Sequence, residues 1–119
     1  MTALAVWVLT VAVMSGAGLG LWHLRTDGGR PPALAGIAHA VFGVIGLGLL
    51  VVALRGPERG IDKGVSGFGV AAAWSFLAAL TVGVLVWVRR RHKPGLSIAI
   101  HAGIAVTAWA LLLAWDGAG

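Results

Sequence analysis

Two histidines in this sequence stand inside long apolar runs, where ionisable side chains are rare. His39 lies in GIAHAVFGVIG, which begins at Gly36, and His101 lies in SIAIHAGIAV, which begins at Ser97. A polar group inside a lipid bilayer is costly and usually has a function. The chain contains no Cys, Tyr, Asn or Gln, and hydroxyls are the other polar side chains within these runs. The absence of a mid-membrane carboxylate or amide argues against proton-coupled exporters and most ion channels.

Two imidazoles suit haem better than a bare metal ion. Metal ions in proteins usually take three or four protein ligands, whereas a porphyrin supplies four and leaves two axial positions for side chains. We therefore expect one haem b with His39 and His101 as its metal ligands, held without covalent bonds because CxxCH is absent. The alternatives are histidines that only pack helices in a structural subunit, or a site for another pigment, an ion or a quinone.

The elements that position these histidines are membrane-spanning helices. Of the 119 residues, 59% are hydrophobic and 11% are charged. A helix needs about 20 apolar residues to cross a bilayer. Four runs qualify, at residues 3–22, 34–54, 65–88 and 95–115, separated by short segments rich in Gly, Pro and charge. We expect an all-α fold: one domain over residues 1–119, an integral membrane four-helix bundle with up-down-up-down connections. Three tryptophans stand at run ends, as interfacial anchors do: Trp22, Trp87 and Trp115.

The four runs form a repeat. The second begins PALAGIAHA at Pro32 and the fourth begins PGLSIAIHA at Pro94, and the first and third end alike, as LWHLR and VWVRR. We expect two similar helical hairpins related by a pseudo-twofold axis along the membrane normal. The repeat places both imidazoles roughly 8–10 Å below the same membrane surface. The second and fourth helices should lie diagonally, with axes roughly 11–14 Å apart, too far for direct His–His contact but suited to a metal between the rings.

Small residues flank each histidine at helical spacing and predict room for something flat and wide. These flanking residues are Gly36, Gly43 and Gly46 for His39, and Ser97, Ala105 and Ala108 for His101. Gly16, Gly20, Ala79 and Gly83 on the other two helices widen that space, although Gly and Ala also serve close helix packing. We expect Ser15 and Thr81 at the haem level. We expect Arg25, Arg30 and Arg89 to pair with the haem propionates.

The basic residues predict the orientation in the membrane. Six Lys or Arg residues flank the first and third connectors, against three in the second connector. The positive-inside rule then places the basic segment 89–93 in the cytoplasm and both termini outside an inner, cytoplasmic membrane. Because the net charge of +5 comes from short connectors, it indicates lipid headgroups as the partner and not nucleic acid.

This pattern resembles the core of the transmembrane ascorbate- and quinol-linked cytochrome b family. The resemblance is architectural and covers the bundle and the PALAGIAHA and PGLSIAIHA segments. It implies haem held between histidines on diagonal helices. That family has six helices and two haems, one in each leaflet, whereas the outer half of this chain has no histidine. His23 and His92 end the first and third helices and could hold a second haem, but exposed or propionate-side roles are expected.

These observations favour an electron-transfer protein over a stand-alone enzyme, and they assign no catalytic residues. The chain would be a haem-bearing subunit or a partner of a quinone-linked redox system. Its partners would be the lipid bilayer, a redox protein or a quinone, and further subunits in a homo- or hetero-oligomer. The alternatives are a non-redox accessory or structural subunit of a larger membrane complex, and a haem sensor or carrier.

Overall fold

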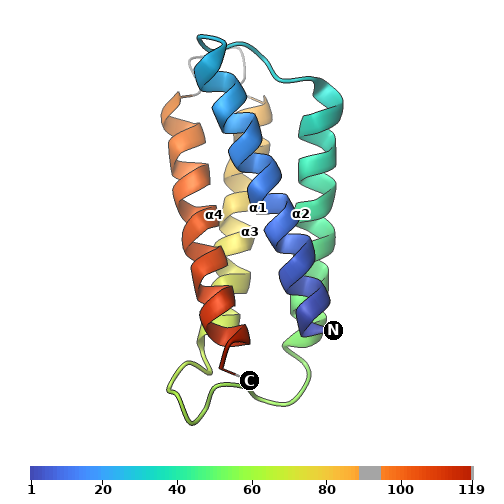
Figure 1. Ribbon diagram of the computed structural model, residues 1–119, viewed down its shortest axis with the longest axis vertical. Helices are drawn as coiled ribbons and strands as arrows, with labels where there is room; N and C mark the ends of the chain where they lie inside the picture. The colour runs from blue at the N-terminus through green and yellow to red at the C-terminus, as the bar shows by residue number, and fades with distance from the viewer. Residues whose placement is uncertain (89–94, 119) are drawn as a thin grey trace.

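The computed structural model describes residues 1–88 and 95–118. Within these residues the chain forms four α-helices, α1 (Thr2–Arg25), α2 (Ala33–Ala53), α3 (Phe68–Val88) and α4 (Gly95–Asp116). The helices run alternately up and down, so that both termini lie at the same end (Figure 1). Each helix is long and apolar enough to cross a membrane. The expected all-α, up-down-up-down membrane bundle is therefore confirmed.

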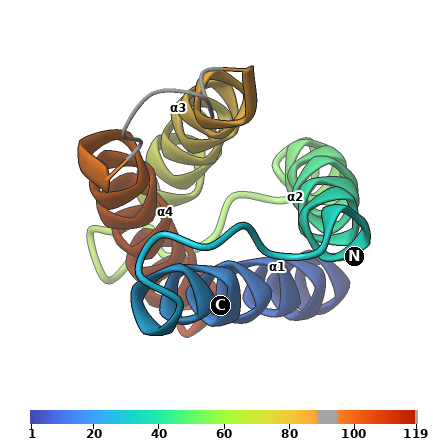
Figure 2. The same cartoon turned by 90° about the horizontal axis from the view of Figure 1, so that it is seen from above.

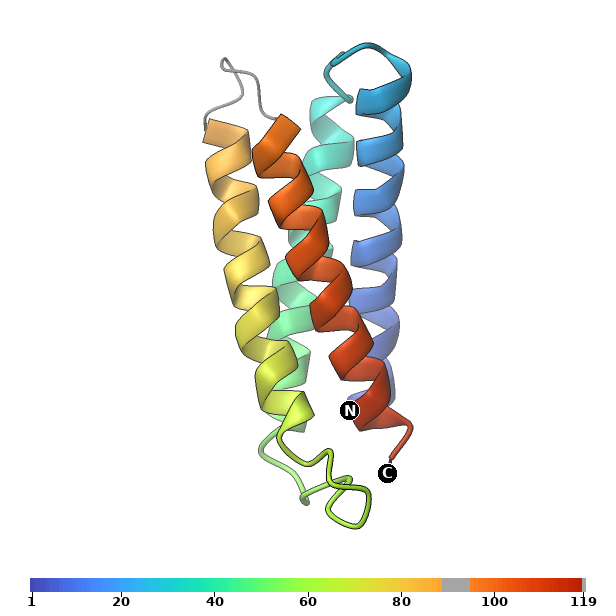
Figure 3. The ribbon, with the colours of Figure 1, turned by 90° about the vertical axis from the view of Figure 1, so that its left-hand side faces the viewer.

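The helices form a ring in which sequential neighbours pack together. α1 packs beside α2 and α4, and α3 likewise packs beside α2 and α4, so α2 and α4 face each other diagonally (Figure 2). Packing is more extensive within the α1–α2 and α3–α4 hairpins than between them. Figure 3 shows α3 and α4 side by side along their length. The bundle is thus two hairpins laid against each other.

The two hairpins bury equivalent residues. Each buried residue of α1 has a buried counterpart 67 positions later in α3, and each buried residue of α2 has one 62 positions later in α4. The pairs are Ala5 and Ala72, Leu9 and Phe76, Ala12 and Ala79, Gly46 and Ala108, and Leu50 and Leu112. His39 and His101 share the second offset. This confirms the expectation of two similar hairpins.

The hydrophobic core occupies one half of the bundle. We call the half nearer the termini the terminal half, and the half that holds His39 and His101 and ends toward residues 26–32 the histidine half. The core cluster lies in the terminal half and consists of Ala5, Leu9, Leu50, Ala72, Phe76, Ala108, Leu112 and Trp115. Among the described residues of the histidine half, only Ala12 and Ala79 are buried. Close packing therefore weakens toward the histidines.

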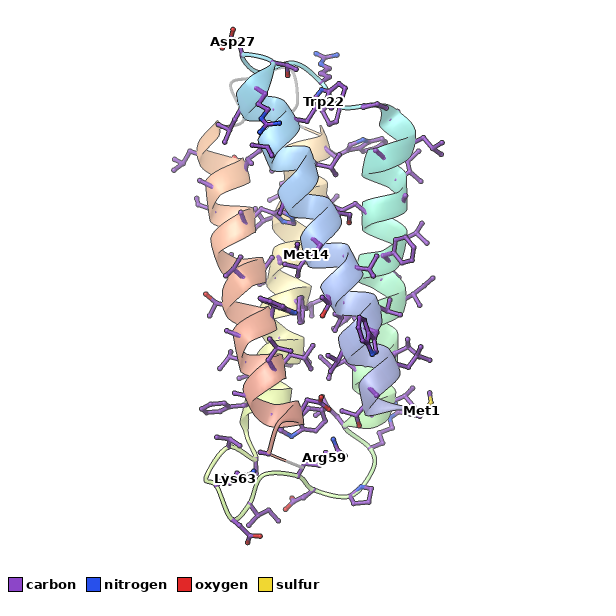
Figure 4. The ribbon with its side chains drawn as sticks, viewed as in Figure 1. Met1, Met14, Trp22, Asp27, Arg59 and Lys63 are labelled. Atoms are coloured by element: carbon purple, nitrogen blue, oxygen red, sulfur yellow. The ribbon has the colours of Figure 1, made fainter. Side chains whose placement is uncertain are left out.

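Trp115 belongs to this core and is not an interfacial anchor. Its side chain is 3% exposed, and a Cβ on Gly69 would lie 2.7 Å from its ring. The expected anchoring role was wrong for this residue because the missing side chain of Gly69 leaves α3 an indentation that the indole fills. Trp22, in contrast, is 48% exposed and lies at the opposite end of the bundle, beside Asp27 (Figure 4).

Two helix ends differ from the hydropathy pattern. α1 continues past residue 22 to Arg25, because both the backbone N–H and the hydroxyl of Thr26 bond the carbonyl of Trp22. α3 begins at Phe68 and not at residue 65, because Val65 is held in a turn by the bond from its N–H to the carbonyl of Gly60. Hydropathy marks the apolar span, whereas backbone hydrogen bonds mark the helix.

The connection between α2 and α3 folds back on the end of α4. Gly60 has φ +73°, and a Cβ there would meet Val65 Cγ2 at 2.6 Å, so this turn requires glycine. Arg59 pairs with Asp116 at 3.3 Å, and Lys63 Nζ donates to the carbonyl of Gly117. Arg59 and Lys63 lie at this end of the bundle (Figure 4). These contacts tie the two hairpins together at the terminal end.

Candidate functional site

The imidazoles of His39 and His101 meet inside the bundle. Their ring centroids are 5.9 Å apart and their planes are at 83° to each other. The expectation that the diagonal arrangement would keep the rings out of contact was wrong. It considered the separation of the helix axes, whereas each histidine projects inward from its helix and closes most of that distance. The expectation that both rings lie at the same depth is confirmed by this contact.

Each ring is held by a backbone carbonyl of the neighbouring helix in its own hairpin. His39 Nδ1 lies 2.9 Å from the carbonyl oxygen of Ala12 on α1, and His101 Nδ1 lies 2.8 Å from that of Ala79 on α3. A carbonyl oxygen can only accept a hydrogen bond, so Nδ1 carries the proton in both rings. In the neutral imidazole, Nε2 then keeps its lone pair and is available as a ligand.

Two glycines allow the rings to approach these carbonyls. A Cβ on Gly16 would lie 2.7 Å from His39 Cε1, and one on Gly83 would lie 3.0 Å from His101 Cε1. Each glycine follows its carbonyl residue by four positions, so both first helices carry the pattern Ala-x-x-x-Gly. From the sequence, these glycines are expected only to make room for a ligand or to allow close helix packing. Gly16 and Gly83 are 67 residues apart, like the buried residues of α1 and α3. This equivalence was the sequence signal that each glycine leaves room for a histidine ring.

Ser15 joins the site, whereas Thr81 does not. Ser15 Oγ donates to the carbonyl of Ala12 and lies 3.2 Å from His39 Nδ1. Thr81 is exposed and donates to the carbonyl of Leu77 on its own helix. The counterpart of Ser15 in the 67-residue repeat is Val82 and not Thr81. The expectation that Thr81 lies at the level of the histidines together with Ser15 was therefore wrong, because Thr81 faces away from the bundle interior.

The small residues beside the rings divide into two kinds. Nothing lies within 4 Å of the position a Cβ would take on Gly36 or Gly43, one turn before and after His39. Gly46 is different, because a Cβ there would meet Leu9 at 2.7 Å; it serves helix packing in the core. Ala105, one turn after His101, is half-buried. The open positions thus flank the histidine, and the closed one lies deeper, in the terminal half.

The other polar candidates lie toward the membrane surface. Arg25 and Arg30 are exposed at and beyond the end of α1, and His23 is half-buried two residues before that end. Arg89 and His92 lie outside the described residues. Met14, a possible alternative ligand by its type, is 61% exposed and lies on the outer face of α1 (Figure 4). The structure therefore brings Ser15 to the paired histidines, and not Met14.

Chemically, the site offers two imidazole Nε2 atoms, one from each hairpin. Among residues 1–88 and 95–118, no third His, Cys, Asp or Glu joins them in a cluster that could hold a metal ion. Two imidazoles that bound one metal from opposite sides, with bonds of about 2.0–2.1 Å, would have ring centroids roughly 6.4 Å apart. The observed centroid separation of 5.9 Å is slightly shorter than that spacing. Comparisons of the chain with protein-family models, curated proteins and solved structures found no match.

Proposed function

We propose that this chain is a membrane b-type cytochrome that carries electrons through one haem b, with His39 and His101 as the axial ligands. One observation carries the proposal: two histidines from different hairpins face each other inside the bundle, and each donates its Nδ1–H to a backbone carbonyl, which leaves Nε2 free to bind a metal. Histidines that bind metals almost always donate their other ring N–H to a carbonyl, carboxylate or water. A backbone acceptor fixes both the tautomer and the ring orientation before any ligand binds.

The surroundings of the two histidines support this proposal. The interior of the histidine half lacks the close packing of the terminal half, and the positions beside Gly36 and Gly43 are open. Apolar walls exclude water, and the two backbone carbonyls hold the imidazoles in place. Bound haem supplies a one-electron iron couple whose potential depends on its axial ligands and their hydrogen bonds. Arg25, Arg30 and Arg89 are positioned in the sequence to neutralise its propionates.

The membrane arrangement follows from the basic residues. The histidine half faces the cytoplasm and both termini lie outside the inner membrane, because Lys and Arg accumulate beside the first and third connectors. One haem in the cytoplasmic half does not span the bilayer, so the chain exchanges electrons with a redox protein or a quinone on that side. The ascorbate- and quinol-linked cytochromes b, which the bundle and its paired histidine segments resemble, hold two haems, whereas this proposal gives the chain one.

A second candidate is a non-redox accessory subunit of a membrane complex. The observation that favours it is the direct contact of the two rings. An edge-on aromatic pair contributes about 0.5–1.5 kcal/mol beyond its buried area, so the contact would add to the core packing that holds the two hairpins together. In that case Gly16 and Gly83 make room for the histidine rings only so that the helices can pack.

The absorption spectrum of the detergent-purified chain, oxidised and reduced, separates the two candidates. A cytochrome shows the low-spin bands of bis-histidine haem and is reduced by a soluble quinol. A carrier or sensor binds haem, but its iron does not equilibrate with quinol. A chain that stays colourless after expression with added haem precursor, and after titration with haemin, favours the accessory subunit.

A further inference from the structure

The two histidines have unequal surroundings, although the hairpins repeat. His39 Nδ1–H faces two oxygen atoms, the carbonyl of Ala12 at 2.9 Å and the hydroxyl of Ser15 at 3.2 Å. His101 Nδ1–H faces the carbonyl of Ala79 at 2.8 Å. The repeat places Val82 at the position equivalent to Ser15, so the second hairpin has no hydroxyl there. The asymmetry therefore rests on one side chain.

The hydroxyl of Ser15 acts as an acceptor toward the ring. Its proton is directed to the carbonyl of Ala12, 2.8 Å away, which leaves the lone pairs of Oγ for His39 Nδ1–H. Donating to a carbonyl polarises the hydroxyl and strengthens it as an acceptor, because hydrogen bonds in a chain reinforce one another. His39 Nδ1–H is thus shared between two acceptors.

We infer that Ser15 is a positioning residue that makes His39 the more electron-rich imidazole of the pair. A hydrogen bond accepted from Nδ1–H raises the basicity of the ligating nitrogen. A more basic axial ligand stabilises oxidised over reduced iron and lowers the reduction potential of a haem. The effect on potential rests on the proposed function, whereas the inequality of the two rings does not.

The first test uses the chain without haem, with its histidines labelled with ¹⁵N, in detergent. Ser15→Ala should move the Nδ1 resonance of His39 and leave that of His101 in place, and Ser15→Thr should restore most of the shift. Ser75→Ala, the same change on α3 one turn before Ala79, serves as the control and should move neither resonance. An unmoved His39 signal in Ser15→Ala, or equal movement of both rings, overturns the inference.

The second test measures the reduction potential of the haem-loaded chain. Ser15→Ala should raise it, Val82→Ser should lower it by adding the missing hydroxyl beside His101, and the double variant should fall near the wild type. A potential that falls or stays unchanged in Ser15→Ala contradicts the inference. If the wild-type chain binds no haem, the proposed function fails, and the ¹⁵N spectra alone decide whether Ser15 distinguishes the two rings.

Discussion

The imidazoles of His39 and His101 lie 5.9 Å apart, nearly perpendicular, although they belong to helices on opposite corners of the bundle. Each ring is anchored to the first helix of its own hairpin, through Ala12 or Ala79. The two rings are therefore a contact between the two hairpins in the histidine half, in addition to the core contacts in the terminal half. Anything bound between them is bound by both hairpins at once.

Gly16 should be sensitive to the smallest possible side chain. In Gly16→Ala the new Cβ would lie 2.7 Å from His39 Cε1 and push the ring from its carbonyl. We expect a loss of about 1–3 kcal/mol in the free energy of unfolding, as for other overpacked sites. Gly18→Ala is the matched control, because nothing lies within 4 Å of its Cβ, and it should leave stability unchanged or raise it by up to about 1 kcal/mol, since Ala is the better helix former. Unfolding titrations in mixed detergent give the free energy of unfolding of each variant. Equal effects of the two substitutions would show that Gly16 is not needed to make room for the His39 ring.

Gly43 and Gly46 should respond differently to the same substitution. Gly43→Leu fills open space one turn from His39, so it should reduce haem occupancy while the bundle stays folded. Gly46→Leu collides with Leu9 in the core and should destabilise the bundle by about 1–3 kcal/mol. Haem per folded chain and helicity by circular dichroism separate the two effects. Full haem occupancy in folded Gly43→Leu would show that the porphyrin does not occupy the space beside Gly43.

Trp109 and Thr10 form the one hydrogen bond between side chains of α1 and α4 in the described part of the chain, at 3.0 Å. The repeat places Leu47 and Leu77 at the equivalent positions, so the bond has no counterpart between α2 and α3. A double-mutant cycle with Trp109→Phe and Thr10→Val should give a coupling energy of about 0.6 kcal/mol, and at most about 1.7 kcal/mol, as for other hydrogen bonds in membranes. A coupling of zero would mean that the bond adds nothing to the contact between hairpins.

The orientation can be tested with single cysteines, because the natural chain has none. Ala118→Cys, beyond α4, should react with a membrane-impermeant maleimide added outside intact cells. Thr26→Cys, in the first connector, should react only after the cells are opened. The reverse labelling pattern would place the histidine half on the outer side and overturn the proposed cytoplasmic position.

Much of the fold could be predicted from the sequence because lipid imposes strong rules. A span needs a long apolar run, and Gly, Pro and charge end it, so the four helices and their order followed from residue types. The matching depth of the two histidines could be predicted because His39 and His101 follow Pro32 and Pro94 at the same spacing, whereas their direct contact could not. The spacing between each proline and its histidine can be counted in the sequence, without knowledge of the structure.

The contacts of the rings could not be predicted in the same way. Whether Gly16 packs a helix, seats an imidazole or opens space for a ligand depends on what lies opposite, and its residue type is the same in all three cases. The alignment of the α1 sequence with the α3 sequence in the repeat is set by equivalent buried residues, such as Leu9 and Phe76. Aligning Trp22 with Trp87 gives an offset that is two residues shorter than the offset between the buried residues. An interfacial position constrains the depth of a tryptophan in the membrane and not its packing between helices.

The most direct measurement of the central claim is the oxidised and reduced absorption spectrum of the chain and its histidine variants, purified in detergent at matched folded concentration. The wild type should show low-spin bis-histidine haem. His39→Ala and His101→Ala should each lose haem or shift to high spin, since each removes one axial ligand. His23→Ala, a histidine near the end of α1, should keep the wild-type spectrum. A double variant, His39→Ala with His101→Ala, that retains a full complement of low-spin haem would contradict the claim.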